Sequence, residues 1–157
     1  MVSIVTIRPM DPTLALDDFI PFRLSFTSNL VSDRIARAYQ TLFDLSIPEW
    51  RLVAVVAETG GISQREIGER TRMDKVTVSR AAIALVERGV LAREANAADK
   101  RSHRLILTEA GRTLHAAIAP EALALERRIF AGFERAELAR FVATLRRIDA
   151  EVLGLDN

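Results

Sequence analysis

Apolar residues recur at intervals of three and four along most of the chain, which is the period of an amphipathic α-helix. The first clear run consists of Phe19, Phe22, Phe26 and Leu30. It predicts a long helix that extends to about residue 45 and begins near Asp17 or Asp18, either of which can cap the first turn. Pro21 falls within that turn, where a missing N–H is tolerated.

Two serines mark the starts of the next two helices. Ser46 and Ser63 are each followed three residues later by a glutamate, and this spacing is the capping-box pattern of a helix N-terminus. The helix after Ser46 is expected to end near Thr59, before a pair of glycines that favours a stop. The helix after Ser63 is expected to be short and to end near Thr71.

A fourth helix and a hairpin follow. Asp74 can cap a helix that runs to Arg88, and the glycine after it supplies a stop. Residues 90–93 and 105–107 are short apolar runs on either side of the polar stretch 94–104. This arrangement predicts two antiparallel strands joined by a loop.

Two further helices complete the pattern. Thr108 can cap a fifth helix that runs to about Gly132, and apolar positions indicate a sixth helix over residues 134–153. The order of short helix, helix and hairpin in the middle of the chain is that of a winged helix-turn-helix. We therefore predict a mainly α (α+β) protein, with a winged helix-turn-helix domain and a helical dimerisation domain built from the N- and C-terminal helices.

This interpretation divides the chain into three parts. We expect an N-terminal arm at residues 1–16, a winged helix-turn-helix DNA-binding domain at 46–107, and a helical dimerisation region formed by 17–45 and 108–157. The last region is expected to form a homodimer, because long amphipathic helices need a surface to cover their apolar stripes. The alternative is that they pack on their own domain. The candidate interface residues are Phe19, Phe22, Phe26, Leu138, Phe141 and Leu145.

Composition narrows the chemistry. The chain has 157 residues, 49% of them hydrophobic, and no cysteine, which excludes disulfides, cysteine-ligated zinc, iron–sulfur clusters and thiol redox sensing. Two histidines are too few for a histidine-rich metal site, so we expect neither metal nor cofactor; ligands from carboxylates or a second subunit are the alternative. We see no secretory signal, and the most apolar segment, residues 52–57, is too short to span a bilayer. We therefore expect a cytoplasmic protein with no membrane partner.

Positive charge is concentrated in the middle of the chain. Residues 63–104 hold 10 Lys or Arg against 6 Asp or Glu, whereas the remainder holds 12 against 15. A local excess of this kind suits a polyanion such as double-stranded DNA, although a solvated charged face is the alternative. Within this segment, Ser63 and Gln64 at the start of the third helix are candidates for contact with the DNA backbone.

The predicted fourth helix has two faces. Its inward set is Val78, Ala82, Leu85 and Val86. Its outward set is Val76, Thr77, Arg80, Ala84 and Glu87, joined at the N-terminal end by Lys75. A recognition helix enters the major groove with its N-terminal residues against the base edges, so the base-reading candidates are Lys75, Val76, Thr77 and Arg80. Lysine and arginine suit guanine, threonine a base or phosphate, and valine the thymine methyl group. An ordinary amphipathic surface helix is the alternative.

The predicted hairpin carries a second cluster of candidates. Arg101 is the candidate for the minor groove, because a narrow minor groove attracts an inserted arginine. Asp99 is expected to pair with an arginine and hold the wing in shape. Lys100, His103 and Arg104 are expected to contact or flank phosphates. A solvated turn is the alternative.

Five runs of sequence, taken in order, resemble the signature of the MarR family of transcriptional regulators. They are residues 62–68 (ISQREIG), 77–80 (TVSR), 85–93 (LVERGVLAR), 99–101 (DKR) and 105–111 (LILTEAG). The resemblance extends from about residue 17 to residue 153. It implies a homodimer that acts at a pseudopalindromic operator, as a repressor or less often as an activator. For many members it also implies release from DNA by small, often aromatic or anionic, effectors at the junction between the two domains.

An effector pocket of this kind would lie near the junction of the first two helices. The candidates there are Tyr39, Phe43, Trp50 and Arg51. For Trp50 the alternative is a core position, and for Arg51 it is solvent exposure.

Other classes of function have less support in the sequence. We find no glycine-rich phosphate loop, nucleophile elbow or metal-spaced ligand cluster, so we expect no enzyme. A winged-helix protein-interaction module would show clustered large apolar residues on the outward face of the fourth helix. A non-specific DNA-binding module would show little preference between sequences.

Overall fold

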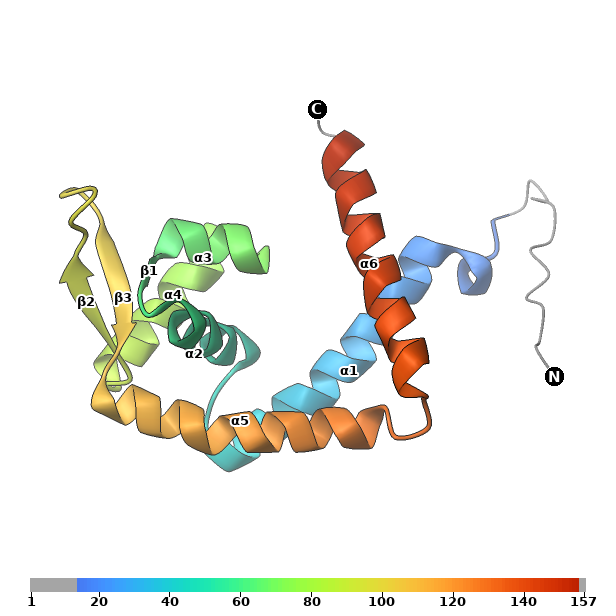
Figure 1. The fold of residues 1–157 in the computed structure, drawn as a ribbon, viewed down its shortest axis with the longest axis horizontal. Helices are drawn as coiled ribbons and strands as arrows, with labels where there is room; N and C mark the ends of the chain where they lie inside the picture. The colour runs from blue at the N-terminus through green and yellow to red at the C-terminus, as the bar shows by residue number, and fades with distance from the viewer. Residues whose placement is uncertain (1–13, 156–157) are drawn as a thin grey trace. The chain divides into compact units, whose positions relative to one another are not determined.

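The computed structural model describes residues 14–155, so most of the arm expected at residues 1–16 lies outside the described residues. The elements are η1 (Leu16–Asp18), α1 (Ile20–Phe43), α2 (Ile47–Thr59), β1 (Ile62–Ser63), α3 (Gln64–Thr71), α4 (Lys75–Glu87), β2 (Leu91–Ala95), β3 (His103–Leu107), α5 (Glu109–Ile129) and α6 (Arg135–Leu155) (Figure 1). These helices and one small antiparallel sheet confirm the mainly α (α+β) class. The chain forms two compact units, and the boundary between His115 and Ala116 falls within α5.

Serine and aspartate side chains cap α2, α3 and α4, as their spacing predicts. The Glu49 amide donates to Oγ of Ser46 at 3.3 Å, and the Ser46 amide donates to the Glu49 carboxylate at 2.7 Å. Ser63 forms the same capping box at the start of α3. The Asp74 carboxylate accepts the Thr77 amide at 2.8 Å at the start of α4. These caps satisfy amide groups that lack a partner within the helix, which fixes where each helix begins.

The start of α1 differs from the expectation. Neither Asp17 nor Asp18 caps this helix, because both lie in the preceding 3₁₀ turn, and α1 begins after Phe19, whose side chain makes no cap. Asp17 instead pairs with Arg23, with 2.9 Å between Oδ1 and Nη1. Pro21 does lie in the first turn of α1, as expected.

The sheet has three strands rather than the two predicted. β3 lies between β1 and β2 and pairs antiparallel with both. The hairpin pairs Leu91 with Leu107 at one end and Ala95 with His103 at the other, so both strands extend beyond the apolar runs. Hydrophobic periodicity does not detect exposed residues that pair through the backbone alone. β1 contains two residues, which is too short to show any period.

Two glycines allow close approach between segments. Gly61, with φ of 145°, has a backbone conformation that favours glycine, and a β-carbon there would lie 2.9 Å from Nη2 of Arg104 and 3.0 Å from Cγ2 of Ile106. At Gly111, near the start of α5, a β-carbon would overlap the backbone carbonyl of Val90. That carbonyl also accepts the amide of Thr108 at 3.1 Å. The absence of a side chain at residue 111 therefore sets how closely α5 approaches the segment that leads into β2.

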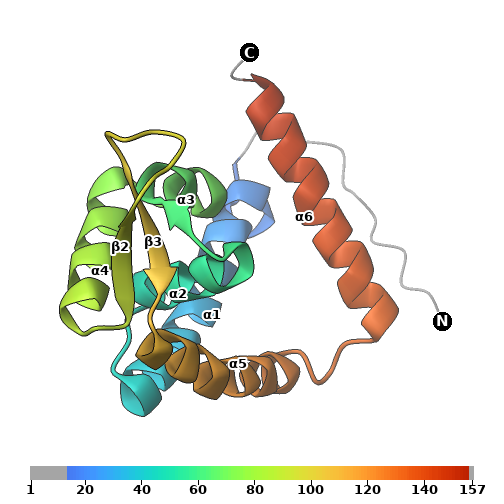
Figure 2. The same ribbon diagram turned by 60° about the vertical axis from the view of Figure 1, so that its left-hand side comes forward.

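The core of the first unit lies among α2, α3, α4 and the sheet (Figures 1 and 2). Its buried side chains include Leu52, Val53, Val56, Ile67, Val78, Ala82, Leu85, Leu91 and Leu105. On α4, Ala81 joins three of the four expected inward residues, whereas the fourth, Val86, is half-buried. Because this face is used by the core, the opposite face of α4 is the one available to a partner.

Arg88 joins the end of α4 to the end of α1. Its Nη1 donates to the carbonyl of Asp44 at 2.7 Å, and its Nη2 donates to the carbonyl of Phe43 at 3.4 Å. Asp44 has a left-handed backbone, with φ of 51°, and marks the end of α1. The guanidinium thus caps carbonyl groups that a helix C-terminus leaves without partners.

The second unit consists of the rest of α5 and of α6. Between Arg135 and Leu155, no residue of α6 is buried. Phe141, Val142 and Val152 are among its exposed apolar side chains, so α6 keeps an apolar stripe open to solvent. The helices between residues 14 and 155 are all too short or too polar to cross a membrane.

Candidate nucleic-acid interface

The outward face of α4 is polar apart from two exposed apolar side chains. Lys75 and Arg80 are exposed, as is Val76. Ile83, three residues after Arg80, is also exposed and shares the face of Val76 and Arg80, because positions i, i+4 and i+7 align on a helix. Ile83 was not predicted, although its seven-residue spacing from Val76 was a signal available in the sequence.

Thr77 lies at the same end of α4, but its donors are already used. Its amide donates to Oδ1 of Asp74 at 2.8 Å, and its hydroxyl donates to Oδ2 at 2.6 Å. These hydrogen bonds, that of the hydroxyl first, hold the pKa of the Asp74 carboxyl below its usual value. Because a phosphate only accepts hydrogen bonds, the hydroxyl can donate to one only by releasing Oδ2 of Asp74. Its lone pairs suit a base amino group instead.

Residues 96–102 form the loop at the tip of the wing. The Asp99 carboxylate accepts the amide of Arg101 at 3.0 Å, and the Ser102 amide donates to the Asp99 carbonyl at 3.0 Å. Nδ2 of Asn96 donates to Oγ of Ser102 at 2.9 Å. Asp99 therefore shapes the wing through the backbone rather than by the expected pairing with an arginine, because its short side chain reaches the amide two residues on. Lys100 and Arg101 are exposed at this tip.

A groove of about 670 Å³ lies between the start of α3 and the wing, and we call it the α3–wing groove. Its lining consists of Ser63, Gln64, Arg65, Glu66, Glu69, Arg93, Asn96, Asp99, Arg101, Ser102 and His103. It brings together five residues predicted from the sequence, namely Ser63, Gln64, Asp99, Arg101 and His103. Arginines stand on both walls, which suits a phosphodiester strand. The predicted residues of α4 do not line it, so the candidate interface has two parts.

Two arginines of the hairpin differ from the expectation. Arg104 was expected near phosphates, but it is half-buried, and its Nη2 donates to the carbonyl of Gly61 at 2.8 Å. It thereby ties β3 to the segment before β1. Arg93 on β2 is exposed and lines the α3–wing groove instead. It was not predicted, because the strand was expected to end at this residue and its side chain was assigned no face.

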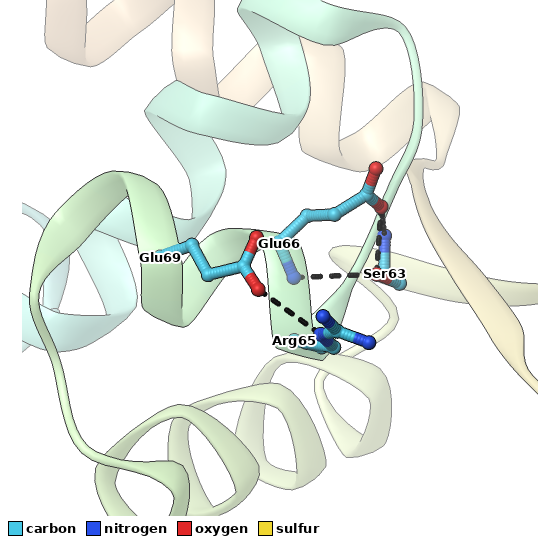
Figure 3. A network of polar contacts seen from close by, with 4 residues as sticks. All are labelled: Ser63, Arg65, Glu66 and Glu69. Carbon is cyan, nitrogen blue, oxygen red and sulfur yellow. Dashed lines mark hydrogen bonds and ion pairs between the residues drawn. The ribbon is translucent and has the colours of Figure 1, made fainter.

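Hydrogen bonds and an ion pair order the α3 wall of the groove (Figure 3). The hydroxyl and the amide of Ser63 donate to the Glu66 carboxylate at 2.6 and 3.0 Å, and these hydrogen bonds hold the pKa of Glu66 below its usual value. The Ser63 hydroxyl, predicted to contact the DNA backbone, is therefore occupied by the cap. Gln64 is half-buried beside it. Further along, Nε of Arg65 lies 3.0 Å from the Glu69 carboxylate.

Aromatic side chains from α1, α2 and α5 pack together in the first unit. The ring of Trp50 lies edge-on to Tyr39, with 5.5 Å between centroids, and stacks on His115 at 5.9 Å with 18° between the planes. Burial raises the pKa of Tyr39. Two of the four predicted pocket residues thus lie together, whereas Phe43 is half-buried and Arg51 is exposed.

A cavity of about 450 Å³ is also lined by His115. Its full lining is Val56, Ala57, Gly60, Glu94, Ile106, Leu107, Arg112 and His115, which includes none of the four predicted pocket residues. Nη1 of Arg112 donates to the carbonyl of Leu107 at 3.0 Å. His115 and Arg112 were missed as pocket residues, because only the folded chain brings the start of α5 to α2 and the hairpin. In residues 14–155, no three histidine or carboxylate side chains gather as a metal site would require.

The predicted dimer residues are open to solvent to different degrees. In the first unit, Phe19 and Phe26 are exposed, and the half-buried ring of Phe22 lies 5.9 Å from that of Phe26. In the second unit, Phe141 is 47% exposed, whereas the two predicted leucines of α6 are half-buried. Each unit thus has apolar side chains available for contact with another surface.

Comparison with known proteins gives a consistent result. Residues 43–102 match the model of the MarR family. The transcriptional regulator HosA of Escherichia coli O157:H7 is 28% identical over 119 residues, which cover 76% of this chain and 88% of that protein. A solved MarR-family transcriptional regulator from Silicibacter pomeroyi is 26% identical, with a TM-score of 0.76, over 92% of this chain and 97% of that one. CouR from Rhodococcus jostii RHA1, solved with p-coumaroyl-CoA bound, is 25% identical, with a TM-score of 0.77, over 87% and 95% of the two chains. The expected winged helix-turn-helix fold is confirmed.

Proposed function

This chain belongs to the MarR family of transcriptional regulators, and from that premise we propose that it is a sequence-specific repressor that binds a pseudopalindromic operator as a homodimer. DNA binding and transcription regulation follow from the family. Repression, the symmetry of the operator, the homodimer and release by an effector are the proposal. The absence of an enzymatic activity stays a prediction.

The outward face of α4 is the observation that carries this proposal. Lys75, Val76 and Arg80 are exposed in its N-terminal half, while the opposite face is held in the core. In a major groove, the lysine and the arginine would donate to guanine, and the valine would pack on a thymine methyl group. A cationic face with an exposed valine suits base readout, because solvation alone gives an apolar side chain no favourable partner.

The wing supplies a second contact. Arg101 is exposed at the tip of a loop that Asp99 shapes through the backbone. A narrow minor groove, as in A/T-rich DNA, has an enhanced negative potential that attracts such an arginine. We expect the wing to favour operators with an A/T-rich flank.

The homodimer rests on apolar side chains that a single chain leaves open. Phe19, Phe26 and Phe141 are large apolar residues exposed on α6 and at the start of the chain's first long helix. A two-fold axis would place two recognition helices in successive major grooves, about 34–36 Å apart. Sedimentation of the protein at micromolar concentration tests this assembly, and a monomer would contradict it.

We propose that the effector is a small aromatic or anionic molecule bound close to the Trp50–His115 stack. The cavity that shares His115 with this stack is lined by apolar side chains together with Glu94 and Arg112, and the related protein CouR was solved with p-coumaroyl-CoA bound. Because Trp50 is the only tryptophan in the sequence, its fluorescence reports on this region alone. Titration with benzoate, as a simple aromatic anion, should change that fluorescence and release DNA. A fluorescence change without release would place a ligand there but remove its regulatory role.

The experiment that tests the function is binding of the full chain to duplexes from upstream of its own coding sequence, against scrambled duplexes, over a range of salt. A preference of about a thousandfold or more, with affinity that falls steeply as salt rises, is the expected result. Equal weak binding to both duplexes would favour a non-specific DNA-binding module. No binding at low salt would favour a winged-helix protein-interaction module, for which the exposed Val76 and Ile83 offer a small apolar surface.

A further inference from the structure

The Arg65–Glu69 ion pair lies on the α3 wall of the α3–wing groove (Figure 3). The two residues are one helical turn apart, with 3.0 Å between Nε and Oε1, and their side chains are 88% and 60% exposed. Exposed pairs of this kind contribute little to stability and are screened by salt. The pair can therefore open without disturbing the fold.

Glu69 differs from the other two carboxylates of the groove. Glu66 accepts hydrogen bonds from Ser63 and starts α3, and Asp99 accepts the Arg101 amide and shapes the wing. In the part of the chain that the structure describes, Glu69 has Arg65 as its partner and caps no helix or turn. Its negative charge therefore acts on an arginine of the groove and on whatever enters the groove.

We propose that Arg65 contacts a DNA phosphate and that Glu69 competes with this phosphate for the Arg65 guanidinium. The ion pair must therefore open for DNA to occupy the α3–wing groove. The inference rests on the proposed DNA binding. A guanidinium binds carboxylate and phosphate oxygens in the same way, so a phosphodiester can replace the Glu69 carboxylate on Arg65. DNA binding at this position is then an exchange of one anion for another.

This exchange has a defined effect on affinity. Removing Arg65 from Glu69 and bringing a phosphate near that carboxylate both oppose binding, whatever the base sequence. Base reading by α4 is unaffected, since its residues do not line the groove. Glu69 therefore lowers affinity for every duplex while it leaves the ratio between operator and scrambled DNA unchanged.

Glu69→Gln is the variant that tests this proposal, because glutamine is a good helix former that lacks the charge. We expect affinity for operator and scrambled duplexes to rise by about tenfold per dimer, with their ratio unchanged, and the salt dependence to steepen by about two phosphate contacts per dimer. Glu58→Gln is the matched control, since Glu58 is exposed on α2, outside the groove, and the change in net charge is the same. Thermal unfolding of each variant checks that the fold is retained.

A double-mutant comparison separates the ion pair from general charge. Arg65 and Arg93 both line the groove, but of these two arginines only Arg65 forms an ion pair with a residue in the described range 14–155. The gain from Glu69→Gln should be largely lost in an Arg65→Gln background and retained in an Arg93→Gln background. Because the Arg65 side chain is 88% exposed, its substitution should leave the fold intact, and thermal unfolding checks this.

Two results would overturn the proposal while DNA binding itself stands. One is a Glu69→Gln variant that binds like Glu58→Gln. The other is an equal gain in both arginine backgrounds. If the wild-type chain binds no duplex at low salt, the proposed function and this inference fail together.

Discussion

The core among α2, α3 and α4 and the helix α6 treat their apolar residues in opposite ways. In the first unit, α2, α3, α4 and the sheet enclose a core whose leucines and valines are buried, and side chains cap the helices that surround it. In the second unit, α6 has a comparable apolar stripe but no buried residue between Arg135 and Leu155. The same amphipathic pattern thus gives a closed core in one place and an open surface in the other.

The difference shows what periodicity means for function. An apolar stripe indicates that one face of a helix is buried, but it does not indicate which surface covers that face. On α4 the stripe is covered within the unit, so its polar face becomes the one that can meet DNA. On α6 the stripe itself is what remains to be covered, so assembly and DNA binding should respond to different substitutions.

The largest expected effect is on assembly. Phe141→Glu places a charge in the open stripe of α6, and burial of one phenylalanine contributes about 1.5–3 kcal/mol. In a two-fold interface both subunits contribute this residue, so the loss of binding free energy occurs twice. We therefore expect the dimer dissociation constant to rise at least a hundredfold in sedimentation, with unfolding of the first unit unchanged. Ala139→Glu, on the opposite side of α6, is the control, and equal weakening by both would show that the stripe is not the interface.

Glycine-to-alanine changes compare the packing of the two units. At Gly111 the added β-carbon meets the Val90 carbonyl, whereas at Gly154 on α6 it meets nothing within 4 Å. We expect Gly111→Ala to lower the free energy of unfolding by about 3 kcal/mol, at the upper end for overpacking because a backbone carbonyl cannot rotate away. Gly154→Ala should be neutral or stabilise by up to about 1 kcal/mol. Denaturant unfolding measures both, and similar losses would contradict the difference in packing.

Arg80→Ala should do the reverse of Phe141→Glu. It removes a cationic group from the outward face of α4 and leaves the apolar stripes intact. We expect a loss of about 2 kcal/mol in operator binding, with relaxed discrimination at one or two base positions and an unchanged dimer. Binding to a panel of single-base operator variants measures this. An equal loss on every sequence would assign Arg80 to the phosphate backbone.

The smallest expected effect concerns acid stability of the capped unit. The pKa of Asp74 is lowered from its ordinary value of 3.8, chiefly by the Thr77 hydroxyl. A folded-state pKa below the unfolded one gives stability that is present above pH 3.8 and is lost as the pH falls through the lowered value. Asp74→Asn keeps the cap without the charge, so its stability should fall less than that of the wild type below pH 3.8. Asp33→Asn, exposed on α1, is the control.

Local signals in the sequence were enough to predict most helix starts. Ser46, Ser63 and Asp74 cap the helices they were expected to cap, because a cap depends on residues three positions apart. Asp17 and Asp18 fail as caps because the chain turns once more before α1 begins. β1 was missed because its partner, β3, is about forty residues away and two residues show no period.

The candidate site was less predictable than the fold. The sequence placed Asp99, Arg101 and His103 in one loop, and the α3–wing groove does contain all three. It could not show that the Ser63 and Thr77 hydroxyls donate to the carboxylates of Glu66 and Asp74, since that depends on where each carboxylate points. Nor could it separate arginines that turn inward from those that line the groove, because this depends on tertiary contacts rather than on residue type.

The hydrogen bonds from Arg88 to the end of α1 connect two helices that are distant in the sequence. The Arg88 guanidinium, at the C-terminal cap of α4, donates to two carbonyls that lie more than forty residues earlier in the chain. The position of the end of α4 is therefore coupled to that of the end of α1 through one flexible side chain. The coupling acts at the opposite end of α4 from Lys75 and Val76, residues proposed to read bases.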